Sequence, residues 1–385
     1  MLSDKILKLS ALVFTKLLYV NYILLFLLIC IFCIGFTLLY SAGGGSMEPW
    51  ASKQLIRFII SLGIYFIVSI INIRYWLGLS YYIYFLSLVL LILVNFYGNT
   101  GMGSQRWLNL GLFNLQPSEL IKFSLVLVLA RYFHADKELS FFNNLKNFIY
   151  PIFLIMIPAY LIFIQPDLGS SLILIIASLT ILFIIGLSIW FFIGSTLLVI
   201  IFAPFAWIFL LYDYQKNRVL TFLDPLRDPL GSGYHIIQSK IALGSGGLFG
   251  KGFMNGSQSH LNFIPEMQTD FIFTLLAEEF GMLGTIVLLS LFIILIFYSL
   301  IIGLICKSRF ACFLAIGVSV NIFYYVFINT SMVTGLIPVV GVPLPLVSYG
   351  GTSMMCVMFG MGLVSNAYIN KNKDLPRYKD GLLGW

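Results

Sequence analysis

Long apolar segments separated by short polar ones make up most of the chain between residues 17 and 369. Most of these segments are near or above the roughly 20 residues that a helix needs to cross about 30 Å of hydrocarbon. We therefore predict an all-α polytopic membrane protein with about ten spans. The expected spans are Leu17–Tyr40, Leu55–Ile73, Leu77–Tyr97, Ser118–Phe133, Phe148–Ile164, Leu168–Leu187, Ile189–Tyr212, Phe271–Cys306, Phe310–Ser331 and Thr352–Ile369.

Composition supports this interpretation and excludes a soluble protein. Of the 385 residues, 60% are hydrophobic and 10% are charged, whereas soluble domains carry about 25% charged residues. The first apolar run is too long for the core of a secretory signal peptide, so we interpret it as a retained span. The whole chain, residues 1–385, is then a single membrane-embedded domain.

The distribution of basic residues predicts the orientation, because cytoplasmic loops carry an excess of Lys and Arg. With the N-terminus inside, the short cytoplasmic segments contain Lys5, Lys8, Lys16, Arg74, Arg131, Lys137, Lys146, Lys307, Arg309, Lys371, Lys373, Arg377 and Lys379. The short outer segments contain Lys53, Arg57 and Arg106. Ten spans place both termini in the cytoplasm and the one large loop, at about 213–269, outside between helices 7 and 8.

Two parts of this topology are less clearly marked. No charge marks the turn in "FIIGLSIWFFIG", which we interpret as the boundary between two spans. The Pro-rich "GLIPVVGVPLPLVSYGG" is either a plain outer loop or a re-entrant segment. Non-helical backbone at membrane depth requires protein or a water-filled cavity around it.

Asp270, in "FIPEMQTDFIF", stands directly before the longest apolar run. One interpretation is a helix cap, because Asp favours that position and the positive end of the helix dipole. The other is a functional carboxylate. Glu278 and Glu279 follow two turns later, which indicates that the helix starts above the hydrocarbon and enters it near Gly281. Asp270 would then lie at the rim of an outward-facing cavity.

The motif "QPSELIKF" starts a helix with Pro117 and Glu119, both ordinary at that position. Lys122 is not, because a cation near the positive end of a helix and close to the membrane needs a partner. Glu119, three residues earlier, can supply it. An acid and a base placed in a span favour a functional role over a purely structural pair, because ionised groups are costly there.

Further candidate groups occur in the outer segments. Arg106 and Trp107, in the Gly-rich "GNTGMGSQRWLNLGLFN", suit a phosphate and a sugar or membrane interface, respectively. Asp167, in "IQPDLGS", is a helix cap or a second carboxylate. The stretch "SKIALGSGGLFGKGF" is not a Walker loop, and we expect no nucleic-acid partner. A carboxylate, two cations and a flexible loop at one face suit a lipid-linked phosphate.

Six segments together resemble the signatures of the SEDS family (shape, elongation, division and sporulation). They are "GSQRWLNLG", "QPSELIKF", "QPDLGSSL", "GSGYHIIQSKIALGSGGLFGKGF", "HLNFIPEMQTDFIFTLLAEEFG" and "GLIPVVGVPLPLVSYGG". The last segment and "AEEFG" are more similar to the elongation branch than to the division branch. The resemblance implies ten transmembrane helices in the bacterial cytoplasmic membrane. It also implies a peptidoglycan glycosyltransferase that polymerises lipid II on the outer face for cell-wall elongation and rod shape.

The resemblance also implies roles for individual residues. Asp270 matches the family's essential carboxylate, expected to act as the catalytic base. Positions that line a polar substrate cavity are matched by Arg106, Trp107, Glu119, Lys122 and Asp167, and a further signature position by Ser348. The chain departs from the family before the Thr-Asp pair, where Met267 and Gln268 replace the frequent basic residue and histidine.

The expected chemistry is an inverting displacement that releases undecaprenyl pyrophosphate, with a divalent cation (Mg or Mn) as a further expectation. The expected partners are membrane lipid, the elongation machinery and a class B penicillin-binding protein acting as the transpeptidase. Two alternatives remain open from the sequence: a lipid II flippase, and a non-catalytic scaffold for that transpeptidase.

Overall fold

The computed structural model describes residues 16–101, 104–109, 111, 114–135, 146–209, 211, 213–225, 232–257 and 267–376. Each of the ten predicted spans coincides with a helix. These helices are α2 (Tyr22–Ala42), α3 (Ala51–Ile70), α4 (Ile73–Tyr97), α5 (Pro117–Ala135), α6 (Lys146–Ile164), α7 (Leu168–Ile185), α8 (Ile189–Phe209), α12 (Ile272–Ile305), α13 (Arg309–Val333) and α14 (Gly351–Ile369). The unmarked turn lies where it was expected, with Gly186 capping the end of α7 at a positive φ of 130°.

Seven helices in the described part of the chain are long and apolar enough to cross a membrane, and α6 and α8 contain shorter apolar stretches. The tenth, α5, contains Glu119, Lys122 and Arg131 and is buried along nearly its whole length. It packs against α4 and α13. Neighbouring helices therefore shelter its charged residues from lipid.

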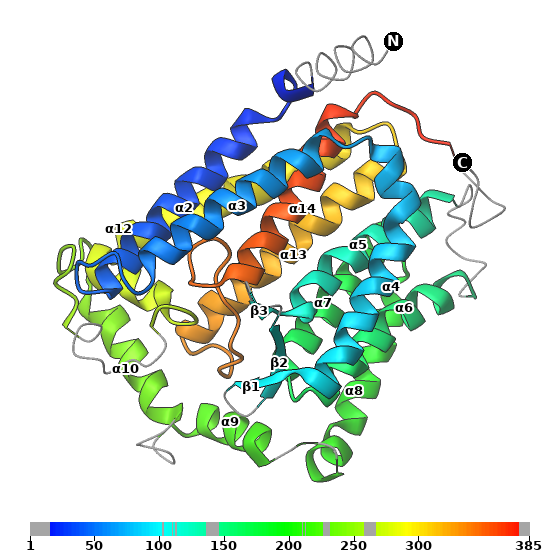
Figure 1. Ribbon diagram of the computed structural model, residues 1–385. Helices are drawn as coiled ribbons and strands as arrows, with labels where there is room; N and C mark the ends of the chain where they lie inside the picture. The colour runs from blue at the N-terminus through cyan, green and yellow to red at the C-terminus, as the bar shows by residue number, and fades with distance from the viewer. Residues whose placement is uncertain are drawn as a thin grey trace.

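The start of α2 and the end of α14 lie at the same end of the bundle (Figure 1). There Lys16 Nζ donates to Ile70 O at 2.6 Å, and Lys307 N donates to Lys371 O at 2.9 Å. This arrangement agrees with the predicted cytoplasmic end. The predicted cytoplasmic residues Lys5, Lys8, Lys137, Arg377 and Lys379 lie outside the described residues.

The opposite end of the bundle carries elements that the all-α prediction did not include. A small antiparallel sheet is formed by β1 (Asn99–Gly101), β2 (Ser104–Asn109) and β3 (Asn114–Leu115), in the order β1-β2-β3. The large outer loop contains two helices, α9 (Asp213–Leu223) and α10 (Ser232–Ser245). Its residues 226–231 and 258–266 lie outside the described part. The sheet and both helices lie together at the outer end (Figure 1).

The Pro-rich segment between α13 and α14 is non-helical and largely buried. A Cβ added to Gly35, in the outer half of α2, would lie 2.5 Å from Val347 Cα. The segment therefore packs against a membrane-spanning helix with protein around it, and we call residues 334–350 the re-entrant segment. Asn329 of α13 holds its backbone, with Nδ2 donating to Val342 O at 2.7 Å.

Helix α12 is broken at Gly281, whose φ of 66° and ψ of −160° are not helical. The break leaves helical carbonyls and amides without their usual partners, and loop residues Gly246–Gly252 supply new ones. Lys251 N donates to Glu278 O at 3.0 Å, and Met282 N donates to Gly247 O at 2.9 Å. We call residues 246–252 the clasp. The clasp fixes the short outer part of α12, which begins two residues after Asp270.

Candidate functional site

A buried cluster joins α5 to α13. Lys122 Nζ donates to Glu119 Oε1 at 2.7 Å, and both side chains are at most 3% exposed. Tyr325 of α13 contacts both residues: its hydroxyl donates to Glu119 Oε2, and its ring centroid lies 4.3 Å from Lys122 Nζ. The predicted pair therefore forms, and Tyr325 is its third member. The hydrogen bond and the cation–π attraction from Tyr325 offset part of the free energy that burying the two charges costs.

A second ion pair joins the small sheet to the start of α7. Arg106 Nε lies 3.4 Å from Asp167 Oδ2, and Arg106 Nη2 donates to Pro166 O at 3.3 Å. Asp167 also caps α7, because its Oδ1 accepts from Ser170 N at 3.2 Å. Arg106 Nε and Asp167 Oδ2 are buried and make no hydrogen bond within the part of the chain that the structure describes. This ion pair thus retains hydrogen-bonding capacity on both partners, which buried polar groups rarely leave unused.

Asp270 lies directly before Phe271, the N-cap residue of α12, so it is not itself the cap of this helix. Its backbone carbonyl accepts from Asn329 Nδ2 at 3.0 Å. A Cβ at Gly341 would lie 3.2 Å from Asp270 Oδ2, and Gly341 has a φ of 77° that favours glycine. The carboxylate therefore lies against the re-entrant segment, at a point where a side chain would crowd it.

Ser348 and Trp107 occupy different surroundings. Ser348 Oγ donates to Thr269 O at 2.6 Å and accepts from Leu344 N at 2.8 Å, so its hydroxyl fixes the residue before Asp270. Trp107 follows Arg106 on β2. Successive side chains of a strand point to opposite faces, which directs Trp107 away from the Arg106–Asp167 pair. The predicted roles of Ser348 and Trp107 as substrate ligands stay predictions.

The re-entrant segment connects these groups. A Cβ at Gly169, two residues after Asp167, would lie 2.0 Å from Val340 Cγ1. Val340 is followed by Gly341, which contacts Asp270. Val342 packs with Tyr325 in a small buried cluster. One short stretch of chain therefore touches the surroundings of both ion pairs and the predicted catalytic carboxylate.

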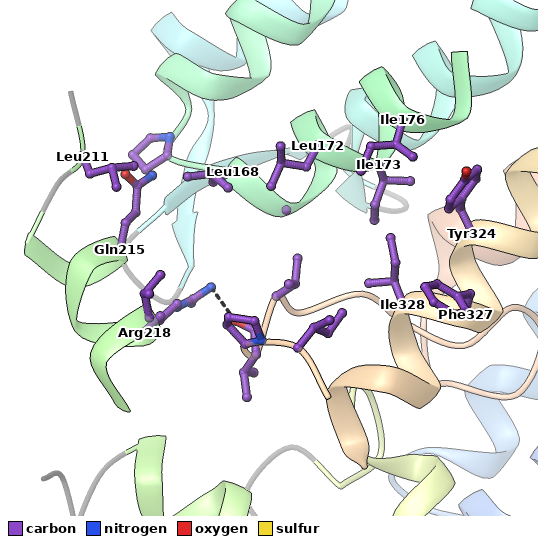
Figure 2. A pocket seen from close by; sticks show the side chains of 17 residues that line it. Leu168, Leu172, Ile173, Ile176, Leu211, Gln215, Arg218, Tyr324, Phe327 and Ile328 are labelled. Atoms are coloured by element: carbon purple, nitrogen blue, oxygen red, sulfur yellow. Dashed lines mark hydrogen bonds between the residues drawn. The ribbon is translucent and has the colours of Figure 1, made fainter. Parts of the chain in front are cut away.

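An apolar pocket of about 530 Å³ lies beside this stretch (Figure 2). Three elements frame it: α7 with Leu168 and Leu172, α13 with Phe327, and α9 with Arg218. Arg218 Nη1 donates to Val339 O at 3.3 Å, the contact drawn as a dashed line in Figure 2. The pocket is also lined by Pro166, Gly169 and Val340, so it adjoins the residues next to Asp167 and Gly341. It thus combines an apolar space with nearby polar groups.

The fit of the expected divalent cation can be judged from the donor set. Among the described residues, no group of three or more His, Cys, Asp or Glu side chains could hold a metal ion. Mg²⁺ commonly binds through one or two carboxylates together with substrate phosphates. Asp270 and Asp167 are oxygen donors of that kind, so a divalent cation with substrate phosphates as further ligands fits these residues.

Sequence reasoning did not select Tyr325 or Asn329, although both contact predicted site residues. Each is a polar residue within the apolar run of α13, where polar groups that are buried need partners. That signal was present in "NIFYYVFINTS", but it did not identify the partners, which come from α5 and from the start of α12.

The fold and the site define a polytopic membrane protein whose outer polar groups border an apolar pocket. Residues 16–373 match the Cell cycle protein family of FtsW, RodA and SpoVE. Peptidoglycan glycosyltransferase MrdB of Escherichia coli K12 is 41% identical over 351 residues, covering 90% of this chain and 93% of the relative. Stage V sporulation protein E of Bacillus subtilis is 33% identical over 322 residues, covering 82% and 86%, respectively.

Two solved structures are similar over nearly the whole chain. One, described as "Structural coordination of polymerization and crosslinking by a peptidoglycan synthase complex", has a TM-score of 0.76 at 32% identity and covers 92% of this chain and 99% of its own. The other is the rod shape determining protein RodA of Thermus thermophilus, with a TM-score of 0.69 at 27% identity, covering 92% and 98%, respectively.

The chain belongs to the FtsW/RodA/SpoVE family, which confirms the SEDS resemblance drawn from its motifs. The higher identity to MrdB than to the sporulation protein agrees with the elongation branch. Its relatives and its apolar helices make it a multi-pass protein of the bacterial cytoplasmic membrane.

Proposed function

We propose that this protein is a peptidoglycan glycosyltransferase that polymerises lipid II on the outer face of the membrane. The observation that carries the proposal is the position of Asp270, Arg106 and Lys122 around one re-entrant segment beside an apolar pocket. A substrate with a sugar, a diphosphate and an isoprenoid chain requires a base, cations and an apolar space together. The relationship to curated glycosyltransferases supports the same activity.

Asp270 is the proposed general base. It takes the proton of the acceptor 4-hydroxyl while that oxygen forms a bond to the anomeric carbon of the donor sugar. The bond from that carbon to the diphosphate breaks at the same time, and undecaprenyl pyrophosphate leaves with the electron pair. One displacement of this kind converts an α-linked diphosphate into a β-linked glycan, so the reaction is inverting.

The cations stabilise the leaving group. Arg106 has a buried Nε without a hydrogen-bond acceptor, and that atom can donate to a phosphate oxygen. Lys122 is enclosed by Glu119 and Tyr325, so we propose that it does not contact the substrate. Its positive charge acts on the leaving diphosphate through space. A divalent cation, when bound with the diphosphate, would add charge neutralisation at the carboxylates of Asp270 and Asp167.

The pocket is the proposed place for the first isoprene units of one substrate. Its lining from α7 and α13 includes large side chains that are exposed in the protein alone, such as Leu172 at 45% and Phe327 at 51%. In the membrane these side chains contact lipid, so an isoprenoid chain that enters the pocket exchanges lipid contacts for protein contacts, and packing decides how well it is held.

The solved relative that is described as a peptidoglycan synthase complex supports a finer partner assignment. We propose that this chain works with a class B penicillin-binding transpeptidase within the elongation machinery. In that arrangement one protein polymerises glycan strands and the other crosslinks them.

The test is polymerisation of labelled lipid II by the purified protein, co-expressed with its cognate transpeptidase, for wild type, Asp270→Asn and Asp213→Asn. Asp213 is an exposed acid at the start of α9 and serves as the matched control. We expect Asp270→Asn to lower turnover about 10²- to 10⁴-fold, because a base in proton transfer contributes that much. Asp213→Asn should polymerise like wild type.

Polymerisation at a normal rate by Asp270→Asn would refute the assignment of the base. No polymer from the wild type, together with transfer of lipid II across liposomes, would instead favour the flippase. Neither activity, with the transpeptidase still bound and stabilised, would favour the scaffold.

A further inference from the structure

Arg57 of α3 is a cation that the proposed mechanism does not use. It is half-buried, and its guanidinium carbon lies 4.5 Å from the ring centroid of Tyr349, at the end of the re-entrant segment. Arg57 forms no ion pair with an acidic residue in the described part of the chain. A guanidinium carries five N–H donors in a fixed fork that matches phosphate geometry, so most of its donors remain available here.

Arg57 lies across the first residue of α14. A Cβ at Gly351 would be 3.0 Å from Arg57 Nε and 3.1 Å from Arg57 Cδ, so the guanidinium side chain packs closely against this glycine. The N-cap residue, Gly350, makes no side-chain cap hydrogen bond, and the first turn of α14 contains no acid. The amides of this turn thus point outward from the positive end of the helix dipole, next to a guanidinium.

A second polar side chain contacts the segment just before this turn. Gln54 lies one helical turn before Arg57 and is fully buried. Its Nε2 donates to Ser348 O at 2.9 Å, and its Oε1 has no hydrogen-bond partner among the described residues. A buried amide oxygen without a partner is costly. The Gln54 Oε1 atom can therefore accept from a ligand that carries hydroxyl or N–H donors, as a phosphorylated amino sugar does.

Hydrogen bonds connect this turn to the proposed active site. Tyr349 N donates to Gln268 O at 2.8 Å, two residues before Asp270. On the other side, Thr352 Oγ1 donates to Asn114 O at 2.6 Å in β3. Strand β3 pairs with β2, which contains Arg106. The start of α14 therefore lies between the segment of the proposed base and the sheet of the proposed leaving-group cation.

We propose that Arg57, Gln54 and the N-terminus of α14 form a second binding site for a phosphate or diphosphate group. This proposal rests on the proposed function, because joining two lipid-linked saccharides brings two diphosphates to one active site. Arg106 serves the leaving diphosphate, and Arg57 holds the diphosphate of the other substrate. Ile56, Ile59 and Ile60 beside Arg57 are 50–60% exposed, so this part of α3 faces the outer leaflet, from which such a substrate arrives.

The test compares wild type, Arg57→Gln, Arg57→Lys and Lys53→Gln in nanodiscs of neutral phosphatidylcholine. Lys53 is an exposed cation one turn away on the same helix and is the matched control. The measurements are the KM for labelled lipid II, the glycan length, the affinity for inorganic pyrophosphate and the thermal unfolding midpoint. Pyrophosphate binding does not depend on turnover, so it tests the site even if the wild type fails to polymerise.

We expect Arg57→Gln to raise the KM and weaken pyrophosphate binding about tenfold or more, because charge-assisted hydrogen bonds are lost. Glycans should be shorter, and Arg57→Lys should fall between wild type and Arg57→Gln, since it keeps the charge without the fork. Lys53→Gln should match wild type. If Arg57→Gln does not fold, the same intermediate loss in Arg57→Lys carries the test.

Wild-type KM and pyrophosphate affinity in both Arg57 variants would overturn the proposal. So would pyrophosphate binding that disappears when phosphatidylglycerol is added, with no change in KM in neutral discs, because Arg57 would then be an ordinary contact for lipid headgroups. A wild type that binds pyrophosphate through Arg57 and makes no glycan would refute the proposed function and leave the phosphate site standing.

Discussion

Replacing Tyr325 with Phe separates the two contacts that Tyr325 makes with the buried ion pair. The ring, 4.3 Å from Lys122 Nζ, is retained, and the hydroxyl that donates to Glu119 Oε2 is lost. Tyr325 is fully buried, and Glu119 is 3% exposed. Water therefore has little access to replace the missing donor. Glu119 keeps Lys122 at 2.7 Å as its remaining charged partner.

The size of the effect follows from the type of bond. A hydrogen bond to a charged group contributes about 1.5–3 kcal/mol, and 1.36 kcal/mol corresponds to a factor of ten. If the Glu119–Lys122 pair acts mainly in the transition state, Tyr325→Phe should lower kcat roughly 10- to 100-fold and leave the KM for lipid II near its wild-type value. Tyr325→Leu also removes the ring, which adds about 0.5–2 kcal/mol from the lost cation–π contact.

The assay is initial-rate polymerisation of labelled lipid II over a range of concentrations, together with thermal unfolding of each variant. Tyr84→Phe is the matched control, because Tyr84 is also buried and its hydroxyl donates to Leu154 O at 2.7 Å, away from the ion pair and the pocket. A kcat for Tyr325→Phe equal to that of Tyr84→Phe would show that the hydroxyl does not position the pair. An equal loss of stability and activity in both variants would show general packing damage.

Two further substitutions, one of a glycine in the re-entrant segment and one of a lysine in the clasp, test the segments that hold Asp270 in place. Gly341→Ala should lower activity and cost about 1–2 kcal/mol of stability, because the φ of 77° at Gly341 is left-handed and the added Cβ would lie 3.2 Å from Asp270 Oδ2. Gly63→Ala is the control for both thermal unfolding and turnover, because Gly63 has open space around it. Lys251→Gln should lower the free energy of unfolding by about 1–3 kcal/mol, because the fully buried Glu278 loses its 2.7 Å ion pair. An unchanged midpoint of thermal unfolding would show that the clasp does not stabilise the outer part of α12.

Apolar run length was sufficient to locate the helices, because hydrocarbon thickness sets the length of each span. It was insufficient for the outer elements. The strands between residues 99 and 115 are short, and the segment is rich in glycine. Each pair of strands is joined by three residue pairs or fewer, so the alternation of apolar and polar residues is too short to predict a strand. The two glutamates before Gly281 predicted membrane entry near that residue, but nothing in the sequence predicted that the helix breaks there. The clasp that satisfies its freed amides comes from residues more than 25 positions earlier, and no local pattern identifies it.

The candidate site divides in the same way. Glu119 and Lys122 are neighbours on one helix, so their spacing alone predicted their pairing. Arg106 and Asp167 are 61 positions apart and meet only in the folded chain, where the Arg106 side chain reaches from β2 to the N-cap residue of α7. The structure accounts for Met267 and Gln268, the two positions where the chain differs from the family's frequent residues. Met267 is buried, and the backbone carbonyl of Gln268 accepts from Tyr349 N. That contact uses the main chain, so the side chain at 268 is free to vary.

The orientation of the helices explains why the outer face is where an anionic substrate is held. With the N-terminus inside, every second span begins outside, so α3, α5, α7, α12 and α14 all direct their positive dipole ends outward. The α7 end is capped by Asp167 and the α5 end is compensated by Glu119. The α14 end has no side-chain cap and lies beside Arg57. Acidic residues thus offset the field at the α5 and α7 ends. The ends of α3, α12 and α14 have neither a side-chain cap nor an acid in the first turn. Of these three, the α14 end is the one that Arg57 adjoins, so a phosphate there would supply the missing negative charge.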